Sequence, residues 1–285
     1  MERHMQGQHA VPLVRQEAAD APFRRVVCAV DGSDGARVAL AQLGRIAPAT
    51  ATVTIVGVIP MLAAIGWSSP GDGSPQQLAA AARSRIQRAT SDGREALGGR
   101  EVQVRMPIGP PADMLLHELD AGGATLVALG AHRRSRVLGY LAGSVASELI
   151  HRAPCSVLVA RQVVGERPFP RSILVGVDGS DASLTAVDVA YGISKRTGAR
   201  MHALVALDDD ADARRARNAL ALVVPGIDLV EDAGDPVDAL VSAGADLVVL
   251  GSRRRRGLRS LGSVGERVAH AASGSVLIVR GGTQV

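Results

Sequence analysis

Aromatic residues and cysteines are scarce in this sequence. Aromatics make up 2% of the 285 residues. The core must therefore be built from Val, Leu, Ile and Ala, as when helices pack on a buried sheet, which favours an α/β fold over an aromatic-rich sandwich. Cys28 and Cys155 have apolar neighbours and lack any CxxC motif or zinc-type Cys/His spacing. Both are interpreted as small buried apolar side chains.

Long apolar runs are missing as well. No run approaches the roughly 20 residues of a membrane-spanning helix, and the start MERHMQGQHA lacks the apolar centre of a signal peptide. We therefore expect a cytoplasmic protein without a membrane partner. The net charge is +4, with basic residues gathered at 132–136 and 253–256. Because these stretches carry no interleaved aromatics, we expect no nucleic-acid partner.

What the chain does contain is an internal duplication. The segment RRVVCAVDGSDGARVAL, starting at Arg24, recurs as RSILVGVDGSDASLTAV from Arg171, and TLVALGAHRR recurs as DLVVLGSRRR. A length of 285 residues also suits two domains. We predict a disordered tail at 1–22, a first domain at 23–163, a linker at 164–170 and a shortened second domain at 171–281.

Within each unit, β-branched runs alternate with Ala-rich segments, which is typical of βαβ units around a buried parallel sheet. The predicted strands are 26–30, 53–58, 102–106, 126–129 and 156–159, then 173–177, 201–206, 227–230, 247–250 and 276–279. The predicted helices of the first unit are 35–46, 76–97, 112–120 and 144–151. The third helix of the second unit should be about one turn shorter. The fold class is α/β, with two tandem doubly wound domains.

The first candidate motif, Asp31-Gly32-Ser33, follows the first strand. In open parallel sheets, ligands bind beyond the carboxyl ends of the strands, where the strand order reverses. A carboxylate there can accept hydrogen bonds from a ribose hydroxyl or a base amine. Alternatively, Asp31 or Ser33 simply caps the following helix.

The second motif follows the fourth strand. Gly130 begins it, a basic loop continues it, and Gly143-Ser144 opens a helix. A helix amino terminus presents unpaired N–H groups and a positive dipole to an anion, and glycine lets phosphate oxygens approach. A Gly-Ser pair can also be only a helix cap. Both motifs in this order within one βαβ domain favour a nucleotide site.

These motifs carry a resemblance to a known family. The VDGS start, the G-x-P-x-x-x-L segment, the L-G-x-x-R loop, the G-S-V helix and the closing APCSVLVAR strand resemble the universal stress protein family across both units. The resemblance implies Rossmann-like domains with strand order 3-2-1-4-5 that dimerise through the last strand. Its ATP-binding branch carries Gly, two residues, Gly, nine residues, then Gly with Ser or Thr.

The resemblance also assigns residues to the nucleotide. In the first unit they are Ala29, Asp31, Val58, Leu129, Gly130, Arg133, Gly143 and Ser144. In the second unit they are Asp178, Gly251, Gly262 and Ser263. Arg133 and Arg254 replace the middle glycine, and arginine there could either bind phosphates or fill their space. The second unit has a spacer of seven residues rather than nine, and Ser263 with Glu266 matches a capping box. We expect its site to be weak or empty.

The leading functional prediction is a universal stress protein that binds ATP, alone or with Mg²⁺, to regulate an unidentified protein partner. We expect no enzyme, because the nearest acidic residues, Asp34 and Glu148, belong to no catalytic motif. His132, His151 and His270 lack metal-ligand spacing. The last strands of the two units should pair within one chain as a pseudo-dimer, and pairing of two chains is left open. The alternative is a ligand-free scaffold that acts through protein–protein contacts.

Overall fold

A computed structural model describes residues 23–60, 75–135, 139–141, 143–161, 168–206, 227–232, 234–252 and 264–281, with isolated positions between 214 and 224. The predicted tail, most of the predicted linker, Arg254 and the pair Gly262-Ser263 lie outside these residues. Below, the first half means residues 23–161 and the second half residues 168–281.

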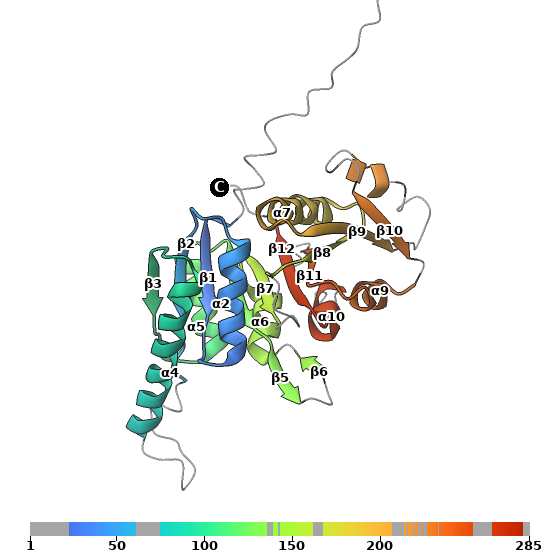
Figure 1. Cartoon of the computed structure of the whole chain (residues 1–285). Coiled ribbons are helices and arrows are strands. Elements are labelled where there is room, and N and C mark those ends of the chain that lie inside the picture. The colour runs from blue at the N-terminus through green and yellow to red at the C-terminus, as the bar shows by residue number, and fades with distance from the viewer. Residues whose placement is uncertain are drawn as a thin grey trace, which may run out of the picture.

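Ten strands form one mixed sheet that runs through both halves (Figure 1). In the first half they are β1 (Arg25–Ala29), β2 (Thr52–Val56), β3 (Val102–Arg105), β4 (Leu126–Gly130) and β7 (Ser156–Ala160). In the second half they are β8 (Ser172–Val177), β9 (Arg200–Ala206), β10 (Asp228–Asp232), β11 (Leu247–Ser252) and β12 (Ser275–Arg280). Each half is parallel, ordered β3-β2-β1-β4-β7 and β10-β9-β8-β11-β12. The predicted order 3-2-1-4-5 is confirmed twice.

The two halves join through their last strands. β7 and β12 pair antiparallel, with Val159 opposite Val276 and Val157 opposite Ile278. An apolar strand left at a sheet edge can pair with other chains, and this junction protects both strands. The predicted intramolecular pseudo-dimer is therefore confirmed at the strands that the sequence indicated.

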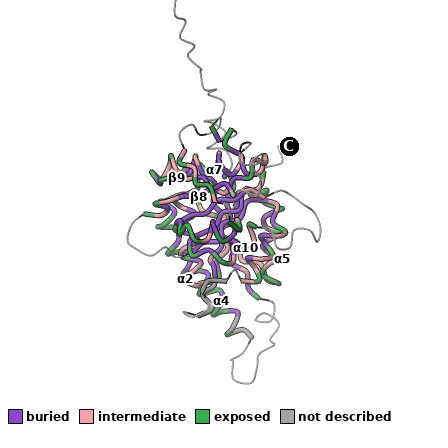
Figure 2. Tube along the Cα trace, turned by 90° about the vertical axis from the view of Figure 1, so that its right-hand side faces the viewer, coloured by how far each residue is buried: buried purple, intermediate pink, exposed green. Residues whose placement is uncertain are grey.

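Helices cover both faces of the sheet. One face carries α2 (Asp34–Ile46), α4 (Pro75–Ala96) and α7 (Asp181–Thr197). The other carries α5 (Pro111–Ala121), α6 (Ser144–Arg152), α9 (Pro236–Ser242) and α10 (Val264–Ala271). Helix α9 has 7 residues where α5 has 11, which confirms the predicted loss of about one turn. Figure 2 shows the buried positions concentrated in the middle of the molecule.

Alternate strand residues supply two core layers. Val26 and Cys28 of β1 pack under α2, and Val27 between them packs on the opposite face, as the two-residue period of a strand requires. Cys28 is fully buried, and this burial raises the pKa of its thiol well above the ordinary value. Cys155 is also buried, as the sequence predicted, and neither cysteine belongs to a disulfide.

One element was not predicted. The basic stretch after β4, which we expected to be a loop, forms a short hairpin of β5 (His132–Ser135) and β6 (Gly139–Leu141). His132 pairs with Leu141, and β6 contacts α10 of the second half. No Asn-Gly or Asp-Gly pair, the strongest short-range hairpin signal, occurs in this stretch. The stretch therefore carries no strong sequence signal for a hairpin.

An ion pair ties the start of β8 to β11. Arg171 donates from Nε and Nη2 to the two carboxylate oxygens of Asp246, each at 2.7 Å, and from its backbone N–H at 2.8 Å. Asp246 is 5% exposed. The side-chain hydrogen bonds from Arg171 hold the pKa of this carboxyl below its usual value. A carboxyl of lowered pKa stabilises the folded state above its unfolded pKa of about 4, and this contribution disappears as the pH falls through the folded value.

Asp246→Asn should therefore lower stability by about 1–2 kcal/mol at pH 7, because it removes the charge that Arg171 pairs with. The difference from the unmodified chain should shrink between pH 4 and pH 2. Thermal unfolding of both proteins across this pH range measures it. A difference that stays constant down to pH 2 would show that the ion pair does not set the acid limb of the stability curve.

Candidate functional site

A cavity of about 250 Å³ opens at the carboxyl ends of β1 and β4, between α5 and α6. Most of the site residues predicted for the first half line it: Ala29, Asp31, Val58, Leu129, Gly130, Gly143 and Ser144. Arg133 lies outside this set. Its backbone belongs to β5, opposite Tyr140, and its side chain falls outside the described part of the chain. The cavity lies at the strand-order switch, where open α/β sheets bind ligands.

The turn after β1 contributes Asp31 to the cavity and so forms its acidic wall. Gly32 has φ +83°, and a Cβ there would lie 2.7 Å from the Cβ of Arg85 in α4. Glycine is therefore required both for the backbone conformation and for the close packing of α4. Ser33 caps α2 by accepting a hydrogen bond from the N–H of Ala36 at 3.2 Å. Asp31 accepts one from the N–H of Ser33 at 2.9 Å. Capping is thus the role of Ser33, whereas Asp31 orders the turn and lines the cavity.

The opposite wall is the amino terminus of α6. Gly143 is its N-cap, and no side-chain cap bonds to this terminus among the described residues. The first-turn N–H groups of a helix have no partner inside the helix, and the helix dipole adds positive potential there. Gly143, Ser144, Val145 and Ala146 all border the cavity. This end of the cavity therefore suits an anionic group.

Gly130 has a packing role that the sequence did not reveal. A Cβ at this position would lie 2.2 Å from the carbonyl carbon of Gly35, where α2 crosses the end of β4. In the second half, a Cβ at Gly251 would lie 2.2 Å from the carbonyl oxygen of Ala182 in α7. The first glycine of the motif is thus required in both halves for a helix to pack on the strand end.

The wall contributed by α5 was missed. Pro111 and Leu115, one turn apart on α5, line the cavity together with Pro60. Both helix residues belong to the G-x-P-x-x-x-L segment, so the signal was present in the sequence but no site role was inferred from it. They make this wall apolar and rigid, as suits the flat face of a base.

The second half repeats the acidic turn. Asp178 accepts a hydrogen bond from the N–H of Ser180 at 3.0 Å, and Ser180 caps α7 as Ser33 caps α2. Gly251 closes β11. The remaining predicted residues, Gly262 and Ser263, lie outside the described residues.

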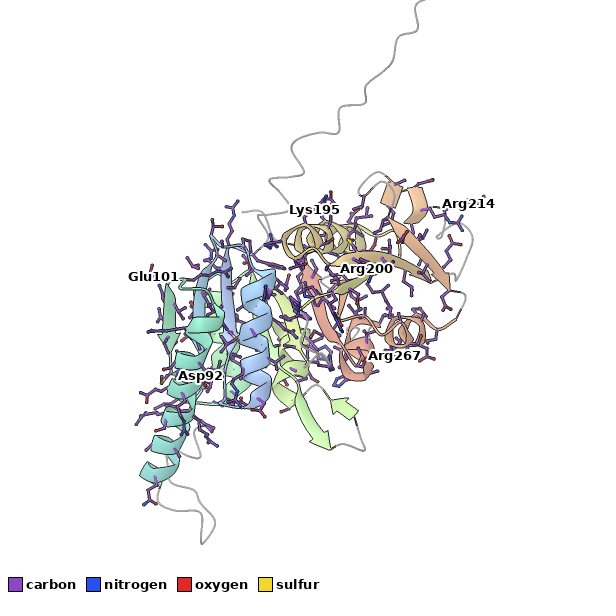
Figure 3. All side chains as sticks on the ribbon, viewed as in Figure 1. Asp92, Glu101, Lys195, Arg200, Arg214 and Arg267 are labelled. Carbon is purple, nitrogen blue, oxygen red and sulfur yellow. The ribbon has the colours of Figure 1, made fainter. Side chains whose placement is uncertain are left out.

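The helix that corresponds to α5 starts differently in the second half. α9 begins after Asp235, whose carboxylate accepts from the N–H groups of Val237 and Asp238. These backbone hydrogen bonds, with Arg267 at 3.4 Å, hold the pKa of Asp235 below its usual value. Arg267 is labelled on α10 in Figure 3. The first half has the uncharged Pro110 at the corresponding position of α5. The second half therefore adds negative charge where the first half has none.

The histidines in the last turns of α6 and α10 each have a partner on the other helix. His151 Nε2 lies 2.8 Å from Glu266 Oε1, and Ser147 Oγ lies 3.3 Å from His270 Nε2. Glu266, expected in a capping box with Ser263, thus bonds to the other half of the chain. Within the described residues, no group of three or more His, Cys, Asp and Glu side chains could hold a metal ion. No helix in this part of the chain is long and apolar enough to cross a membrane.

The fold and the cavity define a class: tandem doubly wound α/β proteins with a pocket at the strand switch point. The chain belongs to the universal stress protein family, whose profile, described as "Universal stress protein family", matches residues 22–161 and 206–280. These two segments cover most of both repeats. The resemblance inferred from the motifs is confirmed.

Individual relatives agree with this assignment. Universal stress proteins Rv2005c and Rv2623 of Mycobacterium tuberculosis are 35% and 34% identical to the chain, over 55% of it and 62% of each relative. The match thus spans less than two thirds of these curated relatives. The chain also matches the crystal structure of a universal stress protein from Archaeoglobus fulgidus. This match covers 91% of the chain and 99% of that protein, with a TM-score of 0.71 and 19% identity. At that identity it supports the fold alone.

Proposed function

We propose that the first half binds an adenine nucleotide and that this binding regulates the contact of the chain with a protein partner. One observation carries the proposal. A single cavity brings together the carboxylate of Asp31, an apolar wall at Pro111 and Leu115, and the amino terminus of α6. A nucleotide has three parts that match these walls: ribose hydroxyls, a flat base and an anionic phosphate group.

Each wall would hold one part of the ligand. Asp31 would accept hydrogen bonds from the ribose hydroxyls, and Val58 and Leu129 would pack beside the base. Backbone N–H groups at Gly143 and Ser144 would bind phosphate oxygens. Mg²⁺ commonly takes most of its ligands from phosphates and water, so the nucleotide could bring it without a dedicated protein cage.

The proposed role is regulation rather than turnover. Hydrolysis needs a positioned base for the water and acidic groups that hold the metal against the γ-phosphate. Among the described residues that line the cavity, Asp31 is the only carboxylate, and it already orders its own turn. The nearby Glu148 bonds instead to Arg152 on the surface.

A scaffold without any ligand is the second candidate, and the glycine packing favours it. Because Gly130 and Gly251 are needed for helices α2 and α7 to pack, their presence does not require phosphate binding. Direct binding measurements separate the two candidates. A scaffold would bind no nucleotide in either half while remaining folded.

Asp31→Ala should weaken ATP binding about tenfold or more, because a charge-assisted hydrogen bond is worth about 1.5–3 kcal/mol. Asp178→Ala is the matched control, since each aspartate accepts a hydrogen bond from the backbone N–H two residues later, at 2.9 Å and 3.0 Å, and Asp178 additionally accepts one from Ser180 Oγ. Equilibrium titration of both variants and the unmodified chain makes the comparison. Equal affinities for all three proteins would remove Asp31 from the site, and a loss only in Asp178→Ala would move the site to the second half.

A further inference from the structure

Helix α6, whose amino terminus borders the cavity, is held at its other end by the second half of the chain. Arg280, the last residue of β12, donates from Nη1 and Nη2 to the carbonyl oxygens of Ala153 and Ile150. The final carbonyl groups of a helix have no partner inside the helix, and arginine is well suited to bind two of them. The backbone N–H of Arg280 also donates to Ser156 Oγ at 3.1 Å.

An arginine of the first half makes a similar contact at the end of α10. Arg161, which follows β7, donates from Nη2 to Ala269 O and from Nη1 to Gly274 O, the latter at 3.2 Å. Its backbone N–H donates to Ser275 Oγ at 2.9 Å. Arg161 and Arg280 close the repeated strands SVLVAR and SVLIVR, so duplication has created two exchanged arginine caps. Arg280 stabilises the end of α6, and Arg161 stabilises the end of α10.

Two further contacts join these helices, each between the last turn of one helix and an earlier turn of the other. His151 of α6 bonds to Glu266 of α10 at 2.8 Å, with the two side chains 20% and 15% exposed. Ser147 of α6 lies 3.3 Å from His270 of α10. The second half therefore contacts α6 in its central turn and at its carboxyl end. The amino-terminal turn of α6 is the part that borders the cavity.

We propose that Arg280 is a positioning residue for the nucleotide site of the first half, an inference that rests on the proposed function. Helix α6 has nine residues and behaves as one rigid element, so its carboxyl end determines where its amino terminus lies. Anion binding by a helix terminus depends on N–H groups placed within hydrogen-bond range of the oxygens. By holding Ile150 and Ala153, Arg280 holds the N–H groups at Gly143 and Ser144 in that range.

This assigns the second half a role in binding as well as in protecting a strand edge. Since the same helix carries the phosphate end of the site and the contact with α10, nucleotide binding and this contact are thermodynamically linked. Linkage is reciprocal, so a nucleotide that binds at α6 also stabilises the α6–α10 contact. A partner that broke the α6–α10 contact would change the nucleotide affinity of the first half.

Arg280→Met in the full chain tests this role, and Arg161→Met is its matched control. Each substitution removes two side-chain hydrogen bonds at the junction. Those of Arg280 go to Ile150 and Ala153 at the end of α6, and those of Arg161 go to Ala269 of α10 and to Gly274 beyond it. Arg161 is 1% exposed and Arg280 is less buried, so the control should lose at least as much stability. We expect Arg280→Met to bind ATP about tenfold more weakly, a change of about 1.4 kcal/mol, and Arg161→Met to bind like the unmodified chain.

A second readout keeps this inference separate from the proposed function. Hydrogen exchange of the amides at residues 144–146, measured without nucleotide, should be faster in Arg280→Met than in Arg161→Met. Glu266→Ala, which removes the contact with His151, should show the same exchange effect more weakly, and it provides the test if Arg280→Met does not fold. Equal exchange in the arginine pair would overturn the positioning role. Absence of ATP binding by the unmodified chain would overturn the proposed function, with the exchange result still deciding the role of Arg280.

Discussion

Gly143→Glu is expected to reduce ATP binding by at least about 100-fold. The new carboxylate would stand at the amino terminus of α6, where the phosphates are proposed to bind, and would repel them and compete for the same N–H groups. Two unit charges about 4 Å apart repel by about 4 kcal/mol near a protein surface, which exceeds the 2.8 kcal/mol of a 100-fold change. Equilibrium titration with ATP and Mg²⁺ measures the loss.

Folding should survive this substitution. Gly143 has φ −65° and ψ 169°, an extended conformation that glutamate adopts freely, and a negative charge at a helix amino terminus is favourable. Gly281→Glu is a suitable control, because Gly281 is exposed and a Cβ there meets no atom within 4 Å. Undiminished ATP affinity in folded Gly143→Glu would exclude the α6 terminus as the phosphate site.

Gly130→Ala and Gly251→Ala should each destabilise the chain by about 3 kcal/mol or more, since overpacking against backbone cannot be relieved by a side-chain rotation. The new Cβ would lie 2.2 Å from backbone atoms of Gly35 in the first case and of Ala182 in the second. The helices α2 and α7 would have to lift from the sheet. Thermal or denaturant unfolding measures both losses.

The control for this pair is Gly281→Ala, which should leave stability within about 0.5 kcal/mol of the unmodified chain. Gly251→Ala is the more informative variant, because it lies in the second half, away from the cavity. If Gly130→Ala lowered nucleotide binding with no loss of stability, Gly130 would be required for ligand binding and not for the packing of α2. If Gly251→Ala were neutral, the packing role would be wrong.

Much of the fold could be predicted because the physical signals are local or repeated. The duplicated segments located β1, β4, β8 and β11, since a buried parallel strand has a continuous apolar sequence, and β-branched runs indicated the other strands. The junction between the last strands, Ser156–Ala160 and Ser275–Arg280, was expected because the family resemblance implies dimerisation through the last strand, and because either apolar strand would otherwise be an unprotected edge. Asp31 and Gly143 could be found because each belongs to a local motif, Asp31 in the turn after a strand and Gly143 at the start of a helix.

What the sequence did not predict depends on contacts between distant residues. The packing role of Gly130 requires knowing that Gly35 of α2 crosses it, and no pattern around Gly130 contains that information. The exchanged caps of Arg161 and Arg280 join residues more than a hundred positions from their partners. For Arg133, the prediction that it either binds phosphates or blocks them stays open, since its side chain lies outside the described residues.

The most direct test is the stoichiometry of ATP binding by the unmodified chain, measured by equilibrium dialysis of folded protein with Mg²⁺ present. We predict saturation near one nucleotide per chain, because the cavity of the first half is bordered by the uncapped terminus of α6, whereas the second half has the carboxylate of Asp235 at the start of α9, where α5 of the first half has Pro110. No saturable binding by the folded chain would contradict the proposal and leave the scaffold function, and two equivalent sites per chain would contradict the asymmetry between the halves.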